Sequence, residues 1–294
     1  MVQHADKLSV NVQGSGAPLV LLHGWGLNQA IWFPIRAQLA QHFRVYTIDL
    51  PGFGESNWQQ GNEDFQHTCA RAAEQLIASI GEPFHLVGWS MGGLIATQIA
   101  LDYSTYVKRL VCVASSPCFV ARPDWPTPST GNMSAMPNGE WPGIKKETLE
   151  TFRYQLTTDF RKTLERFLAV QALGSPAARE EIKAMRALLA ERPEPQPEAL
   201  VAGLRWLAEV DLRSALGALN VPSLHMYGRR DSLVPIAASA AVARYLPSSI
   251  GHSSELHASE QHSSCQFDAS AHAPFFTEPE LFVQRLQQFL MPDA

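Results

Sequence analysis

A serine flanked by glycines supplies the clearest chemistry in the sequence. Residues 88–93 read Gly-Trp-Ser-Met-Gly-Gly, directly after the apolar run 84–87 and at the start of a helical pattern. This order predicts a tight strand-to-helix turn with Ser90 at its apex, where small neighbours leave the hydroxyl clear of the backbone. A serine held in this way is a nucleophile for acyl transfer when a base and an acid lie beside it.

Two other residues have the types that would activate this serine. Asp231 follows the strand pattern 223–227, and His272 follows a shorter strand pattern at 265–268. Parallel strands end at one edge of a sheet, so the three side chains are expected to meet there, in the chain order Ser, Asp, His. Taken singly, Asp231 could be a turn or helix-cap residue and His272 an ordinary loop histidine. Their joint placement favours a catalytic triad of Ser90, Asp231 and His272.

Acyl transfer also needs donors for the oxyanion that forms on the attacked carbonyl. The backbone N–H of Met91, at the positive end of the predicted helix, is one candidate. The N–H of Trp25 is the other, because residues 23–26 read His-Gly-Trp-Gly after an apolar strand and glycines let the backbone approach a substrate closely. The alternative for this segment is a plain corner between a strand and a loop.

Alternating strand and helix patterns must position these groups. The chain has 294 residues, 46% hydrophobic and 17% charged, which suits one large domain or a domain with an insert. Several strand patterns are apolar on both faces, as in a sheet covered by helices on both sides. The sequence therefore predicts an α/β fold with a mainly parallel, doubly wound sheet. Strands are expected at 8–13, 18–23, 43–50, 84–87, 109–114 and 223–227, with helices at 28–41, 66–80 and 91–103.

The rhythm breaks between residues 119 and 216, where no convincing strand pattern occurs. A proline- and glycine-rich stretch, 123–143, predicts a surface loop, and helical patterns follow at 146–159, 160–173, 177–191 and 197–207. We expect core segments at 1–118 and 217–294, with 119–216 inserted as a helical lid over the carboxyl edge of the sheet.

Composition limits the other classes of function. A net charge of −5 argues against a general nucleic-acid-binding protein. No secretory signal pattern or membrane-spanning apolar run is found, and four widely spaced cysteines fit reduced thiols, so a cytoplasmic protein that does not bind membranes is expected. His252, His257 and His262 have the wrong spacing for a metal site and lie in a serine-rich stretch. No metal or cofactor is expected, and we expect a monomer.

The motifs together resemble the α/β-hydrolase superfamily and, within it, the pimeloyl-[acyl-carrier protein] methyl ester esterases of biotin synthesis. The segments that carry the resemblance are 21–28 (LLHGWGLN), 49–54 (DLPGFG), 88–94 (GWSMGGL), 113–119 (VASSPCF), 165–171 (ERFLAVQ), 210–213 (VDLR) and 271–275 (AHAPF). The matches inside the predicted lid are the most specific, because many esterases share the core motifs. Stretches 126–141 and 248–260 are longer than the family pattern and would reshape the rim of the site.

The resemblance implies an α/β-hydrolase fold, the same triad and a set of substrate contacts. These contacts are Trp25, Ser90, Met91, Phe167, Leu168, Ala169, Val170, Gln171 and His272. It also implies an esterase that cleaves the methyl ester of a dicarboxylate acyl chain whose other end is linked to acyl-carrier protein. The alternative is a general short-chain carboxylesterase with the same triad. Dehalogenases and epoxide hydrolases of this fold are disfavoured because they carry aspartate where Ser90 stands, and a non-catalytic relative would lack a triad member.

The predicted lid differs in charge from the rest of the chain. Residues 145–192 hold ten Lys or Arg against seven Asp or Glu, inside a chain of net charge −5. Lys162 and Arg166 lie four apart on one helical pattern, and Arg179 and Lys183 lie four apart on the next. Solvated helix faces with intrahelical pairs to Glu165 or Glu180 would explain them. The family resemblance implies instead that these four residues dock the acidic acyl-carrier protein.

Overall fold

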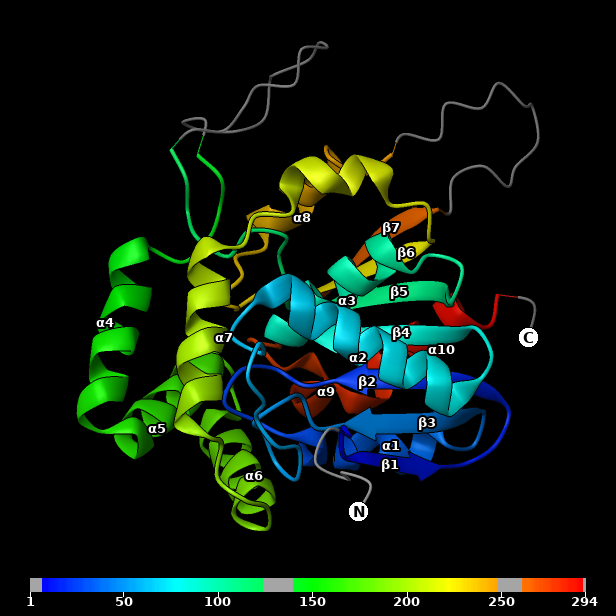
Figure 1. The fold of residues 1–294 in the computed structure, drawn as a ribbon. Helices are drawn as coiled ribbons and strands as arrows, with labels where there is room; N and C mark the ends of the chain where they lie inside the picture. Colours follow the sequence, from blue (N-terminus) through cyan, green and yellow to red (C-terminus); the bar gives the residue numbers. More distant parts are fainter. Residues whose placement is uncertain (1–6, 124–139, 248–260, 293–294) are drawn as a thin grey trace, which may run out of the picture.

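A seven-stranded sheet forms the centre of the computed structural model (Figure 1), which describes residues 7–123, 140–247 and 261–292. The strand order is β1-β3-β2-β4-β5-β6-β7, and every neighbouring pair is parallel except β1 with β3. The predicted α/β class with a mainly parallel sheet is confirmed. The strands are β1 Val10–Gln13, β2 Ala17–Leu22, β3 Phe43–Ile48, β4 Phe84–Trp89, β5 Val107–Val113, β6 Ser223–Gly228 and β7 His262–Phe267.

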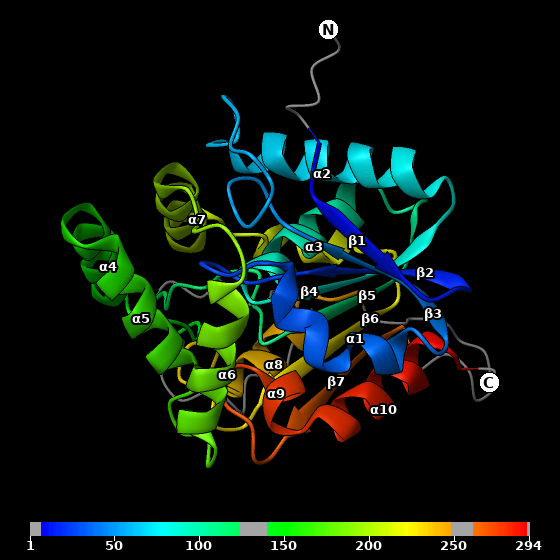
Figure 2. The same cartoon turned by 90° about the horizontal axis from the view of Figure 1, so that it is seen from below.

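Helices cover both faces of this sheet (Figure 2). Helices α2 (Phe65–Ile80) and α3 (Met91–Asp102) pack on one face, and α1 (Phe33–Leu39) and α10 (Pro279–Leu290) pack on the other. The helices on each face pack against the sheet to form a separate hydrophobic cluster, which explains why β2 and β4 are apolar on both sides. Helices α8 (Ala237–Ala243) and α9 (Pro274–Thr277) complete the core. Among the described residues, no helix combines the length and apolar character that a bilayer crossing requires.

The helix expected over 28–41 is wrong in one respect. A 3₁₀ turn at Gln29–Trp32 comes first, and α1 starts only at Phe33. Pro34 explains the break, because a proline has no N–H to donate and is tolerated only in the first turn of a helix. Strand β7 also begins three residues before the predicted Cys265, and its edge position leaves it half-exposed with no apolar run to mark it.

Four helices lie between β5 and β6, at one side of the sheet (Figure 1). They are α4 Lys146–Thr158, α5 Phe160–Gln171, α6 Ala178–Ala190 and α7 Pro197–Glu209, close to the predicted spans. Here we call this block of four helices the lid. Most of the expected loop 123–143 and all of 248–260, including His252 and His257, lie outside the described residues, so the longer stretches 126–141 and 248–260 stay expectations.

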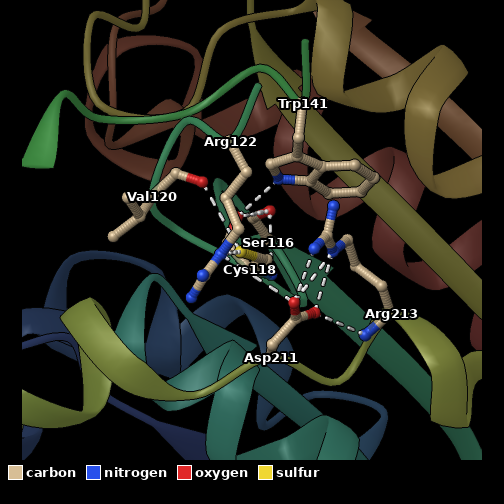
Figure 3. Close-up of polar contacts among 7 residues, drawn as sticks. All are labelled: Ser116, Cys118, Val120, Arg122, Trp141, Asp211 and Arg213. Carbon is tan, nitrogen blue, oxygen red and sulfur yellow. Dashed lines mark hydrogen bonds and ion pairs between the residues drawn. The ribbon is translucent and has the colours of Figure 1, made fainter. Parts of the chain in front are cut away.

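Where the chain leaves the core for the lid and where it returns, the two segments are joined (Figure 3). The Leu212 N–H donates to the Pro117 carbonyl at 2.8 Å, and Arg122 Nε of the departing segment lies 3.9 Å from Asp211 Oδ2 of the returning one. Within the returning segment, Arg213 donates to the Asp211 carboxylate through Nε and Nη2 at 2.9 and 2.6 Å. Burial raises the pKa of the Asp211 carboxyl, but the hydrogen bonds and charge of Arg213, with the charge of Arg122, outweigh it and hold that pKa below its usual value. The base of the lid is thus fixed by a partly buried ion cluster.

Candidate active site

Ser90 lies at the apex of a strained turn between β4 and α3. Its backbone adopts φ 55° and ψ −121°, a region that residues other than glycine rarely occupy. The neighbouring glycines are required by space, because a Cβ on Gly88 would collide with the Gly92 carbonyl, and a Cβ on Gly92 would lie 2.5 Å from the His23 oxygen. The turn therefore presents the Ser90 hydroxyl at the carboxyl edge of the sheet.

His272 and Asp231 are brought together although 41 residues separate them. The His272 Nδ1 atom lies 2.7 Å from Asp231 Oδ2, and both side chains are fully buried. The other carboxylate oxygen, Oδ1, accepts the N–H groups of Leu233 and Val234 at 2.8 and 3.0 Å. Since the carboxylate is an acceptor, Nδ1 carries the imidazole proton and Nε2 keeps its lone pair. Nε2 is buried with no partner among the described residues, Ser90 included, so no hydrogen bond joins the serine to the imidazole.

Ser115, two residues after the end of β5, supports the elbow, and the sequence reasoning missed it. Its hydroxyl donates to the Ser90 carbonyl at 2.8 Å. A Cβ on Gly93 would lie 2.5 Å from the Ser115 hydroxyl, so the elbow and this serine fit only because residue 93 is glycine. The preceding residue, Ala114, has φ 44°, which is the second strained position of the site.

His23 fixes the turn that carries Trp25. Its Nε2 accepts the Leu50 N–H at 3.0 Å, so Nδ1 is the donor to the Gly24 carbonyl at 2.7 Å. Burial lowers the pKa of His23 and keeps the ring neutral. This histidine is therefore structural: it ties the turn after β2 to the end of β3 and holds the Trp25 backbone beside the elbow.

Trp25 and Met91 lie together under the lid. Both are fully buried, and the Trp25 indole N–H donates to the Leu200 carbonyl of α7 at 2.9 Å. The Phe167 ring of α5 packs against the Trp25 ring at 4.6 Å between centroids. Met91 is the first residue of α3, where a backbone N–H has no partner within its own helix.

The five consecutive lid residues 167–171 do not all face the site. The Gln171 carbonyl accepts the His272 N–H at 3.1 Å, and the Gln171 Oε1 atom is buried without a partner among the described residues. Leu168 is buried in the cluster on the other side of the sheet, Val170 is half-buried, and Ala169 is exposed. Helical geometry sends successive residues to different faces, so the structure brings Phe167 and Gln171 to the site and leaves Ala169 away from it.

Gly203, which the sequence reasoning also missed, lies where α7 packs against Trp25 and Met91. A Cβ at this position would be 2.5 Å from the Trp25 Cδ1 atom and 2.9 Å from the Met91 sulfur. A glycine in the middle of a helix costs about 0.5–1 kcal/mol relative to alanine. A glycine kept in a helix despite this cost was the signal available in the sequence. The physical reason for it is the close approach of α7 to the Trp25 indole.

We expect Gly203→Ala to lower kcat/KM on the order of 10-fold, because the added methyl pushes α7 or Trp25 from its place and small displacements near a reacting centre are costly. The measurement is ester hydrolysis together with the thermal midpoint. Gly217→Ala is the matched control, since a Cβ there has its nearest neighbour, the Tyr245 carbonyl, at 3.9 Å. Equal activity of the two variants would contradict the packing argument.

The four basic residues predicted to dock the carrier protein point to solvent. Lys162 and Arg166 lie on α5, Arg179 and Lys183 lie on α6, and all four are exposed. The two helices contact each other, and no ion pair joins any of the four to another described residue. The predicted alternative, pairing with Glu165 or Glu180 along the helix, is therefore absent from the part of the chain that the structure describes.

The sheet order, the strained serine elbow after β4 and the histidine–aspartate pair after β7 and β6 define an α/β hydrolase of the serine type. The family model of the alpha/beta hydrolase fold matches residues 17–279. Solved structures agree in fold: an esterase from Exiguobacterium antarcticum has a TM-score of 0.78 at 21% identity, covering 96% of this chain and 95% of that one. A bromoperoxidase from Bacillus anthracis has a TM-score of 0.77 at 20% identity, with coverage of 96% and 95%.

Curated relatives are more similar in sequence. A pimeloyl-[acyl-carrier protein] methyl ester esterase from Aeromonas salmonicida is 44% identical over 96% of this chain and 100% of its own length. The protein of the same name from Vibrio cholerae is 43% identical, covering 95% of this chain and 96% of its own. The chain belongs to this family of α/β-hydrolase esterases, and the resemblance noted in the sequence is confirmed.

Proposed function

We propose that this chain hydrolyses the methyl ester of pimeloyl-acyl-carrier protein to the free ω-carboxyl acyl carrier and methanol, in biotin synthesis. The observation that carries the proposal is identity of 42–44% over nearly the whole length to relatives that bear this name, lid included. A hydrolase fold with a buried histidine–aspartate pair and a strained serine supplies the matching chemistry.

In the first half of the proposed reaction, the Ser90 hydroxyl attacks the ester carbonyl carbon and its proton passes to His272 Nε2. Asp231 holds Nδ1–H and stabilises the imidazolium that forms. The N–H groups of Trp25 and Met91 are the proposed donors to the oxyanion, each contributing about 3 kcal/mol. When the tetrahedral intermediate collapses, His272 returns the proton to the methoxy oxygen and methanol leaves.

In the second half, water attacks the acyl-enzyme carbonyl and gives its proton to His272. Collapse of the second intermediate restores the Ser90 hydroxyl and releases the carboxylate end of the acyl chain. Phe167 and Gln171, which approach Trp25 and His272 from the lid, are proposed to hold the chain. Each step is a proton transfer or an acyl transfer, so the residues described are sufficient for the cycle.

The surroundings of the enzyme are also proposed. All four cysteines are free thiols in the structure, which supports a reducing cytoplasm. The proposed catalytic residues all come from one chain, so the proposed reaction needs no residue from a second copy. The exposed and unpaired Lys162, Arg166, Arg179 and Lys183 support docking of an acidic acyl-carrier protein on α5 and α6.

Reversing the charges of Arg166 and Arg179 to glutamate is expected to raise KM for the carrier-bound ester on the order of 10-fold and to weaken its salt dependence. Turnover of a p-nitrophenyl ester is expected to stay within about 2-fold, because rim charges act on encounter over about 8 Å at physiological ionic strength. The measurement is kcat and KM for both esters across a salt series. Lys108→Glu with Arg285→Glu is the control: both are exposed, on β5 and α10, and give the same change in net charge.

Two results would count against this docking proposal. Equal losses on both esters would show damage to lid packing, and unchanged KM for the carrier-bound ester would overturn the assignment of the surface. The same comparison tests the function itself. A wild-type kcat/KM that favours the p-nitrophenyl ester over the carrier-bound methyl ester would support a general carboxylesterase instead.

A further inference from the structure

The backbone of His272 is held by the residue that precedes the nucleophile. The indole N–H of Trp89 donates to the His272 carbonyl at 2.7 Å, across 183 residues of sequence. The two rings also lie against each other, with centroids 5.6 Å apart and planes inclined by 47°. Trp89 is fully buried. The side chain at the second position of the elbow therefore links Ser90 directly to the segment that carries its base.

This link matters because His272 lies in irregular chain. Strand β7 ends at Phe267 and α9 starts at Pro274, so no sheet ladder or helix fixes residue 272. One backbone hydrogen bond comes from its own N–H, to the Gln171 carbonyl in the lid. The hydrogen bond from Trp89 connects the His272 carbonyl to the core, because Trp89 is the last residue of β4.

The Trp89 indole is itself held in one orientation. Its ring packs edge-on against Phe275 at 5.0 Å between centroids, with an interplanar angle of 86°, and against Trp32 at 6.5 Å with an angle of 76°. Both neighbours are fully buried. An aromatic ring packed in this way has little rotamer freedom, so its N–H stays directed at the His272 carbonyl.

We propose that Trp89 is a positioning residue for His272: its N–H fixes the histidine backbone relative to Ser90, so that Nε2 faces the hydroxyl it must deprotonate. The inference rests on the proposed serine-esterase mechanism and adds to it the element that sets the distance between nucleophile and base. The glycines of the elbow leave space for the Ser90 side chain. Trp89 fixes the position of the His272 segment relative to the elbow, although the two segments are far apart in sequence.

The sharpest test replaces Trp89 by 3-benzothienylalanine, in which sulfur takes the place of the indole N–H and the ring shape is kept. We expect kcat to fall about 10- to 100-fold with KM nearly unchanged, because the base is displaced and the acyl pocket is not. Trp89→Phe should show the same split. Trp32→Phe is the matched control: it disturbs the same ring packing around Trp89 but removes no hydrogen bond, since the Trp32 Nε1 atom is buried without a partner among the described residues.

A second measurement is independent of turnover. The proton between His272 Nδ1 and Asp231 should give a downfield NMR resonance that persists in Trp32→Phe and broadens in both Trp89 variants. Wild-type kcat and an unchanged resonance in the benzothienyl variant would overturn the proposal. A wild-type enzyme that hydrolysed neither ester would overturn the proposed function alone, because the resonance still reports how His272 is held.

Discussion

Replacing Ser90 by alanine is expected to lower kcat about 10⁶-fold, as removal of a triad nucleophile does in other serine enzymes. Alanine keeps the Cβ and therefore the strained φ of 55°, so the substitution changes the chemistry at position 90 and leaves the backbone as it was. The thermal midpoint should stay within a few degrees of the wild type. Substrate should still bind, because the lid contacts of Trp25 do not involve the hydroxyl.

The measurement is hydrolysis of the carrier-bound methyl ester and of a p-nitrophenyl ester, with purified protein. His272→Ala should lose activity to a similar extent, because the hydroxyl then has no base. Labelling by an active-site phosphonate separates true residual activity from a contaminating esterase, since Ser90→Ala cannot be labelled. Near-wild-type turnover in a preparation that takes no label would remove Ser90 from the mechanism.

Sequence reasoning works at the elbow because the local constraints there are severe. A positive φ at Ser90 and the close approach of Gly88 to Gly92 leave few residue types that fit, so six residues of sequence are enough to predict the strained turn. Asp231 and His272 are recognisable for a different reason. Each follows a strand, and a parallel sheet gathers strand ends at one edge.

The supporting contacts could not be predicted in this way. Ser115 and His23 read as ordinary loop residues, and their roles depend on partners, Ser90 and Leu50, that are distant in sequence. The bond from Trp89 to His272 spans 183 residues, and periodicity carries no information about it. A single glycine inside a helix, Gly203, gave a local signal, but its cause is the indole of another element.

The same limit explains the incomplete prediction of the pocket. A sequence match marks residues 167–171 as a block, whereas a helix distributes them around its axis. Phe167 and Gln171 reach the site, and Ala169 does not. At Pro34 a single residue overrides the periodic pattern. The apolar spacing of 28–41 is helical, but the missing N–H of the proline divides the segment into a 3₁₀ turn and a helix.

Asp231→Asn is expected to lower kcat about 10⁴-fold, and the surroundings of the carboxylate give the reason. Oδ1 accepts the N–H groups of both Leu233 and Val234, so an amide at position 231 must keep its oxygen on that side. Its NH₂ group then points at His272 Nδ1, where the carboxylate now accepts. The imidazole must carry its proton on Nε2 instead, and in that tautomer it cannot take the proton of Ser90.

Comparison with Asp231→Ala decides whether the tautomer is the cause. Alanine removes every hydrogen bond at this position but does not force the wrong tautomer, so we expect its kcat to be no lower than that of Asp231→Asn, while its thermal midpoint falls further. Nitrogen NMR of His272 should show the proton on Nε2 in Asp231→Asn. If Asp231→Asn is fully active, the acid that orients His272 is another residue, to be sought after an earlier strand. If the kcat of Asp231→Ala is much lower than that of Asp231→Asn, the hydrogen bonds from the Leu233 and Val234 backbone matter more than the tautomer.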